Sequence, residues 1–218
     1  MNSLKRFTHK WLWVILIAFC IVGIIYPKIG IVALICMLAP IIVAFFKGRM
    51  WCGSFCPRGS FNDIILAKLS YKKAVPKFMK SVWFRNIFLI LLMSAFVVQL
   101  VFAWGNALAV GQVFVRMIII TTLMAIILGI SFNQRTWCMV CPMGTVAHYV
   151  ANIEVLKRRF NHVTIEKGTC IDCKLCSKNC PMGINVLQHK NQGKVIDADC
   201  LKCNVCVDKC PKKSLYAA

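Results

Sequence analysis

The sequence has few acidic side chains. Of 218 residues, 7 are Asp or Glu against 27 Lys or Arg, and only 16% are charged while 59% are hydrophobic. A soluble domain of this length carries more charge, so the composition predicts a membrane protein. Residues 1–163 contain only two acids, Asp63 and Glu154, and their cations flank apolar runs. That placement indicates that the cations determine the membrane topology and contact anionic membrane lipid. We expect no nucleic-acid partner.

Histidine is also scarce, which excludes several cofactors. The four histidines (His9, His148, His162 and His189) are expected outside the membrane spans, so no pair is available for a transmembrane b-type haem. There is no C-x-x-C-H for c-type haem, and neither G-x-G-x-x-G nor a P-loop for a nucleotide. A surface position is the expected role of His148. No small-residue cleavage site follows the first apolar run, which favours a membrane span over a signal peptide.

Long apolar runs predict four transmembrane helices, each near the lower length for crossing a ~30 Å hydrocarbon core. Turns are expected at Pro27-Lys28 and over 105–111. Lys and Arg gather at the N-terminus, in residues 47–85 and after residue 133. The positive-inside rule then places both termini on the cytoplasmic side of the cytoplasmic (inner) membrane. The runs are Trp11–Tyr26, Ile29–Phe46, Asn86–Trp104 and Phe114–Phe132.

Cysteine, by contrast, is abundant, and eight of the 14 cysteines form two matching runs near the C-terminus. Both runs have the spacing C-x2-C-x2-C-x3-C-P, which ligates [4Fe-4S] clusters in bacterial two-cluster ferredoxins. In that arrangement the fourth cysteine of each run reaches the other cluster. One cluster is therefore assigned Cys170, Cys173, Cys176 and Cys210, and the other Cys200, Cys203, Cys206 and Cys180.

Zinc and disulfides are the competing interpretations of these runs. Structural zinc sites pair two separated C-x2-C knuckles, whereas three cysteines within seven residues do not easily close a tetrahedron around one ion. Cytosolic thiols are kept reduced, which disfavours disulfides. We therefore expect a membrane domain over residues 1–163 and a two-[4Fe-4S] ferredoxin-like domain over residues 164–218.

A second repeat lies in the membrane part. The pattern R-x-W-C-x3-C-P-x-G over residues 49–59 recurs as R-x-W-C-x2-C-P-x-G over residues 135–144. Each copy follows a pair of apolar runs, so the predicted fold is membrane α-helical, with four helices as two repeated hairpins. Hairpins of the same polarity suggest a pseudo-two-fold axis along the membrane normal. Proline suits the first helical position, which places Cys56 and Cys141 near helix N-caps.

Three interpretations of the membrane cysteines stay open. Together they can hold a third metal centre, and the neighbouring cluster motifs favour another iron–sulfur cluster. They can act as redox-active dithiols or bind cuprous copper, which soft thiolates select. They can also be structural residues that pack at helix ends. The four cysteines are Cys52, Cys56, Cys138 and Cys141.

These motifs together resemble the NapH-type membrane ferredoxins and, more distantly, the membrane parts of nitrous-oxide-reductase maturation and cupric-reductase assembly proteins. The resemblance covers nearly the whole chain. It implies electron transfer between the quinol pool or cytoplasmic donors and a membrane or periplasmic acceptor. The chain departs from the family in having two residues, not three, between Cys138 and Cys141, and in lacking an extra-cytoplasmic flavin domain.

The sequence thus predicts a membrane-bound iron–sulfur electron carrier or oxidoreductase subunit. Its expected partners are membrane lipid, a quinone or quinol or a redox protein, and a larger membrane oxidoreductase complex. Two alternatives are a copper reductase or assembly factor that uses the membrane thiols, and a redox sensor without turnover. The sequence does not name the electron donor, the acceptor or the direction of flow.

Overall fold

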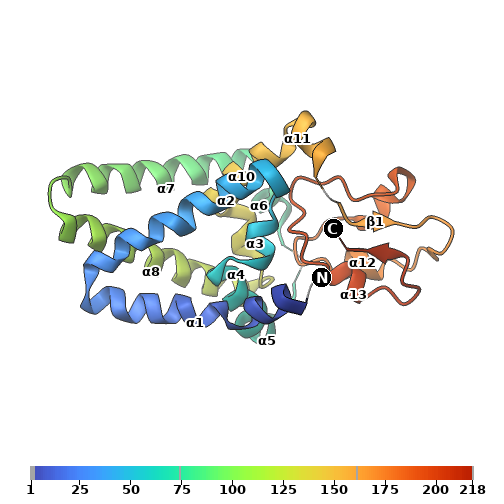
Figure 1. The fold of residues 1–218 in the computed structure, drawn as a ribbon, viewed down its shortest axis with the longest axis horizontal. Coiled ribbons are helices and arrows are strands. Elements are labelled where there is room, and N and C mark those ends of the chain that lie inside the picture. Colours follow the sequence, from blue (N-terminus) through green and yellow to red (C-terminus); the bar gives the residue numbers. More distant parts are fainter. Residues whose placement is uncertain (1–2, 74, 161, 218) are drawn as a thin grey trace.

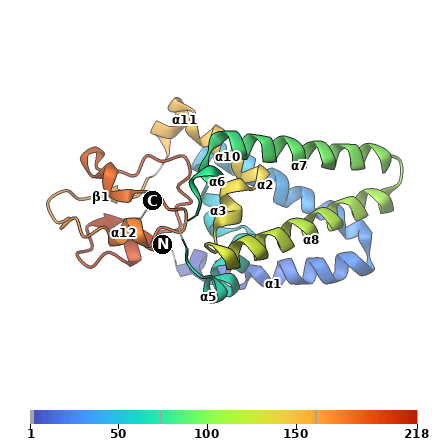
Figure 2. The same cartoon turned by 180° about the vertical axis from the view of Figure 1, so that it is seen from behind.

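The computed structural model describes residues 3–73, 75–160 and 162–217. Long helices form one end of the molecule and the C-terminal segment forms the other (Figure 1), and the reverse view gives the same division (Figure 2). The side chains of Lys5 and Arg6, part of the basic N-terminus, lie outside the described set. The long helices are α1 (Ser3–Ile25), α2 (Ala33–Lys47), α7 (Val82–Phe102) and α8 (Ala107–Ser131).

Within the described residues, four segments are long and apolar enough to cross a membrane, as the sequence predicts. They are Phe7–Ile25, Pro27–Lys47, Val82–Phe102 and Ala107–Ser131. Most of their large apolar side chains are exposed, as expected of surfaces that face lipid.

Two details of the span prediction were wrong. The first candidate span begins at Phe7, so His9 lies inside it. The fourth begins at Ala107, so Gly111 belongs to a helix and not to the turn expected over 105–111. The side chain of Asn106 explains this earlier start, because it caps α8 by accepting hydrogen bonds from the backbone N–H groups of Leu108 and Ala109.

Helices α1 and α2 are joined by the short 3-10 segment η1 (Pro27–Val32), which packs directly on α8. A methyl group at Gly30 would lie 2.1 Å from the carbonyl oxygen of Gly111, and one at Gly111 would lie 2.0 Å from that of Pro27. Small residues let the two backbones touch, as at helix contacts in membranes. Pro40 lies inside α2.

Short helices fill the region between the long helices and the C-terminal segment. A helical stretch begins at Pro57 and includes a π-helical turn, η2 (Asn62–Leu66). The stretch that begins at Pro142 is divided into two helices, because Ile153 adopts an extended conformation between them. The short helices are α3 (Met50–Ser54), α4 (Pro57–Phe61), α5 (Ala67–Leu69), α6 (Lys77–Lys80), α9 (Thr136–Val140), α10 (Pro142–Asn152) and α11 (Glu154–Arg159).

The C-terminal segment has little regular structure. Its strands β1 (Thr164–Ile165) and β2 (Leu215–Tyr216) pair antiparallel and bring its two ends together. One buried apolar cluster joins this segment to the membrane motifs, since it contains Cys52 and Cys138 as well as Leu201. The remaining elements are α12 (Leu175–Lys178), the 3-10 segment η3 (Val186–Gln192) and α13 (Val205–Asp208).

Candidate functional site

The C-terminal segment contains two cavities, each lined by four cysteines. The first has Cys170, Cys173 and Cys176 from one run and Cys210 from the other. The second has Cys200, Cys203, Cys206 and Cys180. Both sets match the ligand groups expected from the sequence, including the exchange of the fourth cysteine. A donor set of four thiols around one space fits a [4Fe-4S] cluster.

The two loops around these cavities have the same backbone conformation. Lys174 and Asn204, at matching positions before α12 and α13, both adopt left-handed φ angles of +60° and +61°. This turn directs backbone N–H groups at the sulfurs: those of Lys202 and Val205 donate to Cys200 and Cys203, respectively. Such hydrogen bonds stabilise thiolate ligands and tune a cluster's potential.

In the described part of the chain, no three His, Cys, Asp or Glu side chains come close enough together to hold a single metal ion. Tetrahedral zinc, with Zn–S bonds of about 2.3 Å, needs sulfurs about 3.8 Å apart. A cluster of four irons holds its ligand sulfurs farther apart than a single zinc ion does. The absence of such a close group is therefore compatible with clusters in the cysteine-lined cavities.

A third cavity lies where the long helices meet the short ones. Its volume is about 210 Å³, it is partly open to the surface, and all four membrane-motif cysteines line it. Cys56 and Cys141 are the N-cap residues of α4 and α10, as predicted, with Pro57 and Pro142 at the first helical positions. Backbone N–H groups of Gly59 and Gly144 donate to these two sulfurs. The structure therefore brings together the two motifs, which are more than eighty residues apart in the sequence.

Two buried arginines cross between the motifs in a reciprocal way. Arg49, from the first motif, donates from Nη2 to the carbonyl oxygen of Cys138 at 2.6 Å. Arg135, from the second, donates from Nη1 to the carbonyl oxygen of Cys52 at 2.8 Å. Arg135 Nη1 also lies 3.5 Å from Cys138 Sγ. Each motif is thus completed by the arginine of the other.

Each arginine also has a carboxylate partner. Arg135 forms a two-pronged pair with Asp63, at 2.8 and 2.5 Å, and His9 Nε2 lies 3.0 Å from the same carboxylate. Burial alone would raise the pKa of Asp63, but the charge of Arg135 and these hydrogen bonds lower it to about 2. Asp63 is therefore ionised at neutral pH and balances one buried cation.

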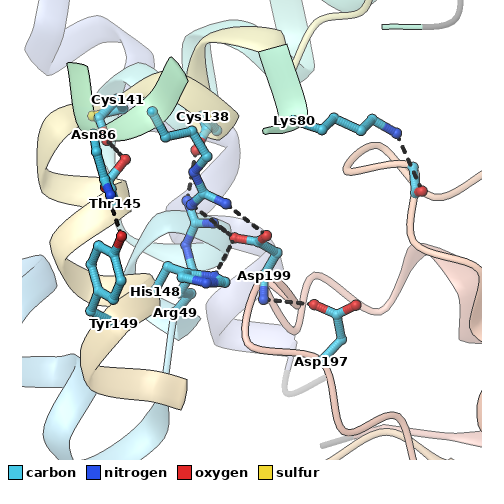
Figure 3. A network of polar contacts seen from close by, with 12 residues as sticks. Arg49, Lys80, Asn86, Cys138, Cys141, Thr145, His148, Tyr149, Asp197 and Asp199 are labelled. Carbon is cyan, nitrogen blue, oxygen red and sulfur yellow. Dashed lines mark hydrogen bonds and ion pairs between the residues drawn. The ribbon is translucent and has the colours of Figure 1, made fainter. Parts of the chain in front are cut away.

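Asp199, which directly precedes Cys200, is the partner of Arg49. Its carboxylate also accepts hydrogen bonds from Arg85 at 2.9 and 3.1 Å and lies 2.9 Å from His148 Nδ1 (Figure 3). Burial opposes ionisation, but these hydrogen bonds and charges hold the pKa of Asp199 far below its ordinary value. This network connects a cysteine loop of the C-terminal segment to both membrane motifs.

No sequence pattern described above predicts this network. His148 was expected at the surface, which is wrong, because its side chain is 19% exposed and bonded to Asp199. Arg85 is the last cation of the basic stretch 47–85, yet its side chain is only 5% exposed. The scarcity of acids in the first 163 residues is the one sequence feature that points to such a network. An arginine buried there needs a carboxylate, and few are available nearby in the sequence.

The chemistry of the four membrane-motif thiols bears on the alternatives left open. Burial raises the pKa of Cys52 to about 11 and that of Cys56 to about 12. Reactive dithiols have lowered pKa values, so free thiols in this environment are poor nucleophiles. Several buried donors at the cavity also have no acceptor among the described residues, namely Trp137 Nε1, Arg49 Nε and Arg58 Nε. A bound group that accepts hydrogen bonds would satisfy them.

Comparison with known protein families identifies 4Fe-4S domains in both parts of the chain. A family described as "4Fe-4S binding domain" matches residues 29–76 and 115–161, each of which includes one membrane-motif cysteine pair. A family described as "4Fe-4S dicluster domain" matches residues 169–215. Together with the candidate spans, these matches suggest an iron–sulfur electron-transport protein.

Several known proteins are similar in sequence. Uncharacterized protein MJ0749 of Methanocaldococcus jannaschii is 25% identical over 84% of this chain and 69% of its own length. MJ0750 of the same organism is 27% identical over 90% of this chain and 84% of its own length. The putative electron transport protein YccM of Escherichia coli is 25% identical over 86% of this chain and 56% of its own length. No solved structure matches the chain.

Proposed function

We propose that this protein is a multi-pass carrier that relays single electrons between quinol or cytoplasmic donors and a membrane or periplasmic redox partner. The observation that carries the proposal is the pair of cavities, each lined by four cysteines with one contributed by the other run. The electron-transport name of YccM supports it. In this proposal the chain has a membrane domain (1–163) built from two repeated hairpins and a ferredoxin domain (164–218), and belongs with NapH-type ferredoxins.

The ligands follow from the cavities. Cys170, Cys173, Cys176 and Cys210 hold the first [4Fe-4S] cluster, here called cluster 1. Cys200, Cys203, Cys206 and Cys180 hold the second, cluster 2. Bound clusters supply reversible one-electron chemistry, while the chain holds them in place, donates hydrogen bonds to their sulfurs and limits the access of water.

A third iron–sulfur centre at Cys52, Cys56, Cys138 and Cys141 extends the proposal into the membrane domain. The name of the family matched by both motif segments supports it, as do the unpaired donors around the cavity. Four thiolates carry a buried negative charge, and Arg49, Arg58 and Arg135 lie near enough to compensate it. Basic flanks that all adjoin the short helices support a cytoplasmic position for this end of the molecule.

Iron and acid-labile sulfide per chain test the proposal on anaerobically purified protein. Two clusters require about eight irons and three require about twelve, at four irons per cluster. The quadruple variant with serine at positions 52, 56, 138 and 141 is expected to lose about four. Cys20→Ser is the matched control, because this cysteine lies outside the motifs and does not line the cavity, and it should keep the wild-type content.

The outcomes separate the parts of the proposal. Twelve irons in the wild type and eight in the quadruple variant support the third centre. Eight irons in both proteins support the two-cluster carrier and contradict the third centre. Copper binding to the membrane-motif cysteines is then the next measurement. Fewer than four irons in the wild type, with the protein folded, contradicts the carrier function itself.

A further inference from the structure

The two cysteine loops of the C-terminal segment have equivalent positions but unequal surroundings. Leu201 follows the first cysteine of the second loop and is 2% exposed, whereas Ile171 at the matching position of the first loop is 58% exposed. Leu201 is covered by the first membrane motif: a methyl group at Gly53 would lie 2.1 Å from its carbonyl oxygen. In the second loop, this position is therefore covered by another part of the same chain, whereas in the first loop it is open.

The whole rim of the first cavity is open in the same way. Cys173 is exposed, and so are Leu175 and Pro211, which line the cavity with Ile171. The cavity assigned to cluster 2 has no exposed residue in its lining. Electron transfer between proteins needs a close approach, so the first cavity is where a separate protein can reach a cluster.

The open rim is positively charged. Lys174 and Lys212 line the cavity and Lys213 adjoins it, and all three are exposed. None of them forms an ion pair with another described residue. The nearby carboxylate of Asp172 is paired with Lys190 at 2.6 Å. An apolar centre with a rim of unpaired lysines complements an acidic protein surface.

From these observations we infer that Ile171, Leu175 and the lysines 174, 212 and 213 form the docking surface for an acidic soluble electron-carrier protein. The inference rests on the proposed function and adds an order to it: cluster 1 exchanges electrons with the soluble carrier, and cluster 2 faces the membrane motifs. A cluster held by Cys170, Cys173, Cys176 and Cys210 would gain the one electron that the carrier loses in each encounter, and no proton or bond would be exchanged.

Association with a purified acidic flavodoxin tests this surface. The full chain with its clusters is placed in nanodiscs of phosphatidylcholine, which has no net charge, and the dissociation constant is measured with both proteins oxidised. We expect binding at 20 mM salt that weakens at least tenfold at 300 mM salt. Replacement of the three lysines by glutamine should weaken low-salt binding about tenfold, and Ile171→Ser about fivefold at either salt concentration.

Lys167→Gln with Lys194→Gln is the matched control, since both lysines are exposed in the same segment but neither lines the cavity. The control should bind like the wild type. No salt-sensitive binding by the wild type, or equal losses in the control and the triple variant, overturns the inference. So does a triple variant that loses binding only to phosphatidylserine vesicles, which would assign the lysines to a lipid surface. Because no electron is transferred in this measurement, iron content tests the proposed function separately.

Discussion

The carboxylate of Asp199 compensates two arginines whose side chains are almost fully buried. Arg49 is 0% and Arg85 5% exposed; Arg85 donates to both carboxylate oxygens, and Arg49 donates to Oδ1. In a protein interior an unpaired guanidinium is far more costly than the pair is favourable. The residue that precedes Cys200 therefore determines whether the second cysteine loop stays on the membrane motifs.

Asp199→Asn is expected to destabilise this contact by about 3 kcal/mol, because it leaves two buried cations without a carboxylate. That corresponds to roughly a hundredfold more frequent local opening. Hydrogen–deuterium exchange of the 199–206 backbone measures it. Asp172→Asn is the control, since its partner Lys190 is at the surface, and it should leave exchange in 199–206 unchanged. Equal exchange in the two variants contradicts this account.

At the scale of elements, α3 packs closely on the second cysteine loop because the contact residue on α3 is a glycine, which has no side chain. Gly53 of α3 contacts the backbone of Leu201, which cannot move aside as a flexible side chain can. Lys202, next in the loop, is 8% exposed and lies over the ring of Phe160 at 4.9 Å. Loss of the close approach would therefore uncover a residue that trypsin recognises.

Gly53→Ala should displace the loop and increase trypsin cleavage after Lys202 about tenfold, since cleavage follows the population of the open form. Gly168→Ala is the matched control, because nothing lies within 4 Å of a methyl group there. The cleavage rate, followed by mass spectrometry, is expected to be unchanged in the control. A Gly53→Ala protein as resistant as the wild type would show that the contact is not required for docking.

The elements differ in how far the sequence predicts them. The four spans follow from apolar runs, and the two cysteine-lined cavities follow from a spacing that encodes a local loop. The N-caps at Cys56 and Cys141 are also local, because proline fixes them. The pairs of Arg49 with Asp199 and of Arg135 with Asp63 join residues far apart in the chain, and no local pattern specifies them. His148 was misjudged for the same reason, since a lone histidine on a helix gives no sign of its tertiary partner.

At the scale of the whole molecule, the third cavity connects the membrane motifs to the interior of the helical bundle. Its lining includes Phe19, Met37 and Leu92 from three long helices, and the four thiols at one end. An apolar space that reaches the four thiols, where we propose the third centre, suits a lipophilic quinol, the membrane donor in our proposal.

Met37→Trp should fill part of this cavity and slow reduction of the clusters by menadiol about tenfold, while dithionite, which needs no apolar site, reduces them at the wild-type rate. Leu38→Trp is the control, since Leu38 is 46% exposed on the outer face of the same helix. Stopped-flow absorbance at the cluster bands measures both rates. If menadiol reduces the Met37→Trp protein as fast as the control, the quinol does not use this cavity.

The reciprocal arginines also have a consequence for the timing of biosynthesis. Arg49 leaves the ribosome long before Cys138, whose carbonyl it binds, and longer still before Asp199, which balances its charge. Chains fold from the N-terminus as they are made, so the first motif lacks these two contacts until the later residues have been translated. Until Asp199 has been synthesised, the charge of buried Arg49 therefore has no carboxylate from this residue to balance it.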